Sequence, residues 1–177
     1  IKALILNFLS EGYNNILGVE LPKVRAQMHL DTVFTQISKD EYLAYIPTLK
    51  NCKLLRFSES DPEGKYLNHS LFDEIKSNNE NAAIISCGGS CEISQKREQW
   101  TDGANALAVK PGMIILYERN KYTIKELQKY GYKVYSSKDI IQNKFSKDEK
   151  LVVKINGGEL SRGRGGARCL TMPLVRA

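Results

Sequence analysis

The chain has 177 residues, of which 26 are Lys or Arg and 20 are Asp or Glu, giving a formal net charge of +6. Hydrophobic residues make up 42 %, which is enough to build a core and excludes a wholly disordered chain. No apolar run approaches the roughly 20 residues that a membrane helix needs, so we expect no membrane partner. The length fits one domain. The mild excess of base is compatible with a nucleic acid or with an anionic substrate and does not decide between them.

No signal peptide is visible, but the chain begins at Ile1 rather than Met, which leaves room for a removed leading segment. The four cysteines, Cys52, Cys87, Cys91 and Cys169, lack the dense spacing of a secreted disulfide scaffold. We therefore expect a reducing cytoplasm.

The first half of the chain is predicted to begin with a helix and to continue with strands. Residues 1–11 are too apolar for a helix that faces water on most sides, and Gly12 marks their end. The other predicted elements are strands at 28–37 and 41–46 joined by a turn at 38–40, a strand at 52–57, a helix at 68–78 and a buried strand at 82–87.

The second half repeats this order. Strands at 104–109 and 113–118 flank the turn signal Pro111-Gly112, a helix follows at 123–130, and a strand at 132–136 closes the group. A capping box between Thr123 and Glu126 is expected to start this helix. Strand–strand–helix–strand thus occurs twice, which predicts an α/β fold of repeated units with propeller-like or layered packing.

The last stretch has a different composition. Residues 144–150 are predicted to form a polar surface loop, and periodicity leaves residues 138–150 open between helix and loop. A strand is predicted at 151–155. Five glycines and three arginines follow in residues 156–168, and Cys169 opens a final apolar run.

His29 and Asp31 form the first candidate pair. In a strand, residues i and i+2 point to the same face, so the imidazole and the carboxylate would lie side by side. An imidazole titrates near pH ~6.5, which suits proton transfer at neutral pH. The alternative is a polar pair on the wet face of an edge strand, which spacing alone favours.

Cys169 and the loop before it form the second candidate group. Glycine lets a backbone approach a ligand closely, and a neighbouring arginine lowers the pKa of a thiol, which is the setting of a thiolate nucleophile. Arg164 or Arg168 could pair with a substrate carboxylate through a bidentate fork. The alternatives are a small buried cysteine at a strand start, a solvated turn, and contact of residues 162–168 with RNA.

The remaining polar residues point to structure. Cys87 and Cys91 are spaced as a CxxxC pair, but no second pair with ligand spacing follows, so a zinc site is not expected. His69 is interpreted as a surface or capping residue. Asp102 and Asn105 are expected to form a turn, and Trp100 to pack.

Three segments together resemble the arginine deiminase family: ELPKVRAQMHLDTVFTQI around His29, WTDGANALAVKPGMIILYERNKYTIKELQKYGYKV in the middle, and GGELSRGRGGARCLTMPLVR around Cys169. They occur in the family's order over nearly the whole chain. The resemblance implies hydrolysis of L-arginine to L-citrulline and ammonia without a metal or an organic cofactor. It also implies the pentein fold, a five-bladed α/β propeller, of which the two ββαβ units would be a part.

Residue by residue, the resemblance implies four roles. Cys169 matches the nucleophile that forms the covalent amidino-cysteine intermediate. His29 matches the general acid and base. Asp31 matches a carboxylate that grips the guanidinium nitrogens, and Arg164 matches a loop arginine that approaches the substrate carboxylate.

The chain departs from the family in length. We expect residues 1–177 to be the C-terminal part of a single catalytic domain whose N-terminal part is absent. The family's glutamate that pairs with the catalytic histidine, its second guanidinium-binding aspartate and its carboxylate-holding arginines have no counterpart in residues 1–28. The full-length parent is expected to be a homo-oligomer that does not bind nucleic acid. The alternatives are another guanidine-modifying hydrolase, acting on agmatine or dimethylarginine, a basic-loop RNA-binding module, and an inactive fragment.

Overall fold

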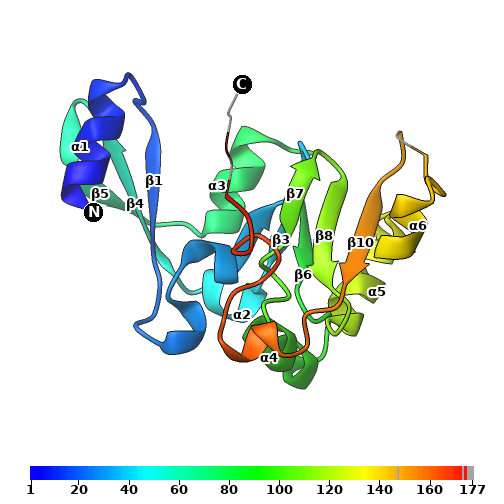
Figure 1. Ribbon diagram of the computed structural model, residues 1–177. Coiled ribbons are helices and arrows are strands. Elements are labelled where there is room, and N and C mark those ends of the chain that lie inside the picture. The colour runs from blue at the N-terminus through cyan, green and yellow to red at the C-terminus, as the bar shows by residue number, and fades with distance from the viewer. Residues whose placement is uncertain (147, 173, 175–177) are drawn as a thin grey trace.

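A computed structural model describes residues 1–146, 148–172 and 174, and it has a mixed α/β architecture with three sheets (Figure 1). The strands are β1 (Ile16–Glu20), β2 (Phe34–Gln36), β3 (Glu41–Ala44), β4 (Lys53–Ser58), β5 (Asp61–Leu67), β6 (Ala83–Ser86), β7 (Leu107–Lys110), β8 (Met113–Tyr117), β9 (Lys133–Ser136) and β10 (Leu151–Ile155). The α-helices are α1 (Lys2–Ser10), α2 (Ile46–Leu49), α3 (Leu71–Asn78), α4 (Glu92–Trp100), α5 (Lys121–Lys129) and α6 (Ser137–Ile141), and short 3₁₀ helices span Arg25–Gln27, Leu30–Thr32 and Leu160–Arg162.

The first sheet has the order β1-β4-β5, with both pairs antiparallel, and lies with α1 at one side of the molecule (Figure 1). The predicted N-terminal helix is confirmed as α1. Its Ile5 and Leu9 pack on Phe57 of β4, and the helix ends before Gly12, whose φ is +87°.

The second sheet has the order β2-β3-β6 and forms the first predicted ββαβ unit. β2 and β3 form the expected antiparallel hairpin, and β6 returns parallel to β3 after α3. The strand predicted at 52–57 is present as β4, but it pairs with β1 and β5 in the first sheet instead.

The third sheet has the order β7-β8-β10-β9 and forms the second unit. β7 and β8 form an antiparallel hairpin around Gly112, whose φ of +78° suits glycine. β9 follows α5 as expected, but β10 lies between β8 and β9, parallel to both. Among the described strands, none of the three sheets closes on itself.

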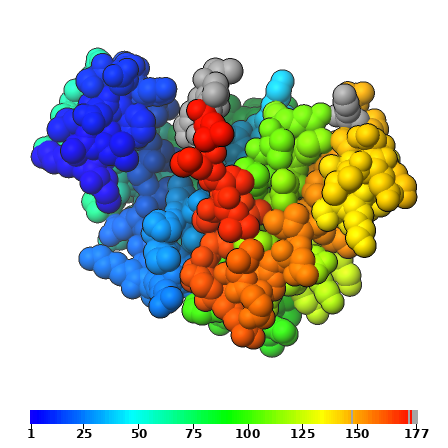
Figure 2. Space-filling view, viewed as in Figure 1, coloured from blue at the N-terminus to red at the C-terminus, as the bar shows by residue number. Residues whose placement is uncertain are grey.

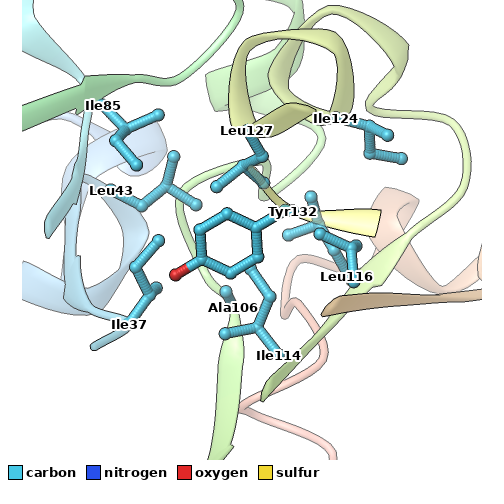
Figure 3. Close-up of a cluster of buried hydrophobic side chains, with 10 residues drawn as sticks. Ile37, Leu43, Ile85, Ala106, Ile114, Leu116, Ile124, Leu127 and Tyr132 are labelled. Atoms are coloured by element: carbon cyan, nitrogen blue, oxygen red, sulfur yellow. The ribbon is translucent and has the colours of Figure 1, made fainter. Parts of the chain in front are cut away.

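One hydrophobic core cluster lies where the two units meet (Figure 3). Leu43 and Ile85 of the first unit pack with Leu116 and Leu127 of the second around the ring of Tyr132. The Tyr132 hydroxyl donates to Glu41 Oε2 over 2.9 Å, and Lys150 Nζ lies 2.6 Å from Glu41 Oε1. A polar bridge therefore joins the units beside the apolar core.

Two local predictions are wrong. Residues 28–33 are not part of a strand, because a 3₁₀ helix spans Leu30–Thr32 and the Thr32 hydroxyl donates to the His29 carbonyl over 2.6 Å. Thr123 does not cap α5, which starts two residues earlier at Lys121, and the carboxylate of Glu98 on α4 caps that end instead.

The C-terminal segment after β10 crosses the surface between the N-terminal residues and the β7–β8 hairpin (Figure 2). The position at 147 in the predicted loop, and those at 173 and 175 in the final apolar run, lie outside the described residues. No described helix has both the length and the apolar character that crossing a bilayer requires.

Candidate active site

Three of the four candidate residues line one surface pocket. The pocket has a volume of about 670 Å³ and is lined by His29, Leu30, Asp31, Phe34, Thr35, Gln36, Arg168 and Cys169. The first six residues come from the 3₁₀ turn and strand that open the first unit, and the last two from the loop that follows β10. The fold thus brings together two segments from opposite ends of the chain.

Asp31 lies close to both residues of the C-terminal loop that line the pocket. Cys169 Sγ lies 4.0 Å from Asp31 Oδ2, and Arg168 Nε lies 4.0 Å from the same oxygen. Asp31 Oδ1 is buried and accepts no hydrogen bond from the described residues. A buried carboxylate oxygen without a donor is costly. This oxygen therefore lacks a hydrogen-bond donor among the described residues.

His29 reaches the pocket from a turn. It caps the 3₁₀ helix Leu30–Thr32, and its carbonyl accepts from the backbone N–H and the hydroxyl of Thr32. The His29 side chain is exposed, and no described residue hydrogen-bonds to its imidazole. The pairing with Asp31 was expected from strand alternation, but both residues line the pocket because the chain turns there.

Asn105 joins the two halves of the pocket, and sequence reasoning assigned it only to a turn. It is fully buried, its Nδ2 donates to the Asp31 carbonyl over 3.2 Å, and its Oδ1 accepts from the Cys169 N–H over 3.4 Å. A Cβ at Gly166 would lie 2.5 Å from Asn105 Oδ1, so glycine is needed for this approach. No local pattern marks such a role, because both partners are distant in sequence.

Arg164 lies outside this pocket. Its side chain is 3 % exposed and is ion-paired with fully buried Asp102 over 3.6 Å. Its guanidinium also donates to the carbonyls of Trp100 and Ala26 and lies 4.8 Å from the centre of the Trp100 indole. Trp100 itself is 49 % exposed, so it packs on the arginine rather than in the core.

The backbone around Arg164 is conformationally unusual. Arg164 has a φ of +69° and Asp102 a φ of +60°, in the left-handed region that ordinary residues seldom adopt. Asp102 Oδ2 accepts from the Gly165 N–H over 3.1 Å, and Tyr117 donates to the Gly165 carbonyl over 2.9 Å. Burial raises the pKa of Asp102, and the Arg164 charge opposes this shift. The ion pair therefore fixes the loop that ends at Cys169.

The other cysteines differ from Cys169. Burial raises the pKa of the Cys87 thiol to about 12, so this side chain stays protonated at neutral pH. Cys91 is exposed at the start of α4 and Cys52 is half-buried, and all four cysteines are unpaired. Within the described residues, no group of three His, Cys, Asp or Glu side chains is placed to hold a metal ion.

Comparison with known proteins identifies related sequences. A family model described as arginine deiminase matches residues 1–176. An arginine deiminase of Mycoplasma capricolum subsp. capricolum is 38 % identical over 175 residues, which covers 97 % of this chain and 39 % of that protein. An arginine deiminase of Borrelia recurrentis is 36 % identical over 179 residues (93 % and 37 % covered), and one of Clostridium perfringens is 34 % identical over 185 residues (97 % and 39 % covered). The chain thus spans less than two fifths of the length of these relatives.

Proposed function

This chain belongs to the arginine deiminase family, and we propose that it forms the C-terminal part of an enzyme that hydrolyses L-arginine to L-citrulline and ammonia. The observation that carries the proposal is the approach of Cys169 Sγ to Asp31 Oδ2 across 138 residues of sequence, in a pocket that His29 also lines. A thiol, a carboxylate and an imidazole are the three groups that cleavage of a guanidinium requires.

The first half of the reaction needs a strong nucleophile, because resonance makes the guanidinium carbon a poor electrophile. The Cys169 thiolate forms a bond to this carbon. Asp31, which lines the pocket, accepts hydrogen bonds from the guanidinium N–H groups and holds the plane in position. One C–N bond breaks, and the nitrogen leaves as ammonia with a proton from the His29 imidazolium.

The second half is hydrolysis of the amidino-cysteine intermediate. Water adds to the same carbon, His29 takes one of its protons, and the second proton passes to solvent. The C–S bond then breaks, the sulfur leaves as thiolate, and the oxygen stays as the ureido oxygen of citrulline. His29 ends protonated and Cys169 ionised, ready for another cycle.

Arg164 is proposed to approach the substrate carboxylate when the loop rearranges. In the described conformation its guanidinium is buried against Asp102, so this contact requires the ion pair to open. The positive φ at Arg164 and the glycines at 163, 165 and 166 are compatible with a second loop conformation.

The wider architecture is also part of the proposal. The two ββαβ units are two blades of a five-bladed pentein propeller, and residues 1–177 are the C-terminal part of one catalytic domain. The parent assembles as a homo-oligomer. Four unpaired cysteines support a cytoplasmic location, where thiols stay reduced.

Agmatine hydrolysis is the alternative that the geometry keeps open. Agmatine has the same guanidinium but lacks the carboxylate, and Arg164 is turned away from the pocket in the described conformation. The two substrates present the same reacting group to Cys169. They differ only at the end that a cation would hold.

The test is turnover of the purified full-length parent with L-arginine and, in parallel, with agmatine. We expect citrulline from L-arginine, and by intact mass an adduct of arginine less ammonia on Cys169. Cys169→Ala should abolish both signals, while Cys87→Ala, which removes a buried thiol, should keep them. Faster hydrolysis of agmatine would assign the alternative substrate, and an adduct that persists in Cys169→Ala would refute the assigned nucleophile.

A further inference from the structure

A second pocket lies between α4 and the start of α5. Its volume is about 680 Å³, and it shares no lining residue with the pocket of Cys169. The side chains that give it its character are Lys96, Arg97, Trp100, Arg119, Lys121 and Tyr122, which we call the basic pocket. We infer that the basic pocket binds a small phosphorylated ligand that carries a planar ring, of the nucleoside phosphate class.

Positive charge in this pocket is not neutralised by its own lining. Glu98 is the one acidic residue that lines it, and its two oxygens accept from the backbone N–H groups of Tyr122 and Thr123 over 2.8 and 2.7 Å. Its charge is therefore directed to the start of α5, where a helix favours an anion. Among the described residues, this leaves Arg97, Arg119 and Lys121 without an acidic partner, while Lys96 pairs with Glu92.

The four cations of the basic pocket differ in the ion pairs and hydrogen bonds that they already make with other residues. Lys96 pairs with Glu92 over 2.8 Å at the surface of α4. Arg119 Nη1 donates to the Gly158 carbonyl and to Ser161 Oγ, which holds the residue in place. No described acidic group pairs with Arg97 or Lys121, so these two are the strongest candidates to contact phosphate oxygens.

Two aromatic rings provide the second recognition element. Trp100 is 49 % exposed and Tyr122 is 52 % exposed, although both line a concave surface. The buried Arg164 guanidinium lies over the Trp100 ring at 4.8 Å, which covers the side that faces the protein. The indole therefore presents its other face to a ligand, and a heteroaromatic base stacks well on such a face.

Size and charge together select the ligand class. Sites for small molecules have volumes of about 300–1,000 Å³, and the basic pocket lies within this range. Several unneutralised cations favour a polyanion over a single carboxylate, and exposed rings favour a ligand with a base over a bare phosphate. This inference does not depend on the chemistry proposed for Cys169.

The test is titration of the purified protein with ATP in the absence of added metal, followed by calorimetry and by the fluorescence of Trp100, the one tryptophan of the sequence. We expect saturable binding that quenches Trp100 and weakens as salt is added. Arg97→Ala with Lys121→Ala should weaken binding roughly a hundredfold, since each charged contact contributes about tenfold. The control double variant Lys65→Ala with Lys76→Ala removes two exposed charges elsewhere and should leave binding unchanged.

Titrations with tripolyphosphate and with adenosine test which part of ATP the pocket recognises. Tripolyphosphate should bind more weakly than ATP, and adenosine should not bind. Lys121→Glu tests the role of this cation with a single substitution. An acidic residue in the first turn of α5 stabilises the helix, so this variant should still fold. Absence of saturable binding, equal weakening in both double variants, or equal affinity for ATP and tripolyphosphate would each overturn the inference.

Discussion

The two ββαβ units begin alike and end differently. Each opens with an antiparallel hairpin, continues through a helix and returns with a parallel strand. In the first unit β6 pairs directly with β3, whereas in the second unit β10 lies between β8 and β9. The extra strand makes the second unit one strand wider.

The extra strand has a consequence for the candidate site. The chain leaves β6 and reaches Cys87 at once, where burial raises the thiol pKa to about 12. It leaves β10 and crosses a glycine-rich loop before Cys169, which is exposed beside Asp31. The same residue type is therefore inert core in one unit and a candidate nucleophile in the other.

The largest expected effect separates these two cysteines. Cys169→Ala should lower turnover of L-arginine more than roughly 10³-fold, because the nucleophile is lost. Cys87→Ala should keep turnover within about threefold, since a protonated buried thiol takes no part. Citrulline formation measures both, and similar losses in the two variants would contradict the distinction.

Asn105→Ala should have the next largest effect. It removes the side chain that bonds to both Asp31 and Cys169, and a displacement of about 1 Å at a reacting group costs roughly 100-fold in rate. The matched control is Asn78→Ala, which also removes two amide hydrogen bonds, but to Glu74 in the first unit. We expect turnover to fall only in Asn105→Ala. The melting temperature should fall in both variants. An unchanged rate would show that Asn105 has no positioning role.

Glu98→Ala tests how the second unit starts its helix. The variant leaves two backbone N–H groups and the Thr123 hydroxyl without their acceptor, which should cost about 2–3 kcal/mol in the free energy of unfolding. Glu126→Ala on the same helix removes an ion pair with Lys129 near the surface and should cost at most about 1 kcal/mol. Urea unfolding measures both, and equal costs would argue against capping by Glu98.

Ser70→Ala is the corresponding change in the first unit and should cost less. Ser70 and Asp73 form a complete capping box at the start of α3, all within one turn and exposed to solvent. Loss of such a cap costs about 1 kcal/mol. A cost as large as that of Glu98→Ala would show that burial does not distinguish the two helix starts.

The smallest effect is a pH dependence that belongs to the first unit. The pKa of Glu74 lies below its ordinary value because His69, Asn78 and Arg56 donate to its carboxylate. Its contribution to stability is therefore complete above pH 4.5 and is lost as the pH falls below that value. The melting temperature of Glu74→Gln should fall less than that of the wild type between about pH 5.5 and 3.5. Parallel curves would contradict this coupling.

Hydrophobic pattern and turn signals predicted most elements with a regular apolar face or a clear turn, including α1, both hairpins and β10. Four elements, β1, α2, α4 and β5, were not predicted, and two of these misses have a clear physical reason. α4 buries polar side chains, Ser94, Glu98 and Gln99, so it has no apolar period to detect. β5 contains proline and glycine and is largely exposed, which gives it the composition of a loop.

For the candidate site, the motifs around His29, Asp31 and Cys169 could be recognised from sequence. The placement of Arg164 against Asp102 and the bridging role of Asn105 could not be. Each depends on partners that lie more than 60 residues away along the chain, and no local spacing encodes such a contact.

The sequence by itself determined the local elements, the two hairpin turns and the chemical groups available for a reaction, because these follow from side-chain periodicity and backbone preference. Only the tertiary structure decided that β10 lies between β8 and β9, that Glu98 starts α5, and that Cys169 meets Asp31. These outcomes depend on which distant segments bury the most apolar surface and satisfy the most polar groups together, and that balance exists only in the folded chain.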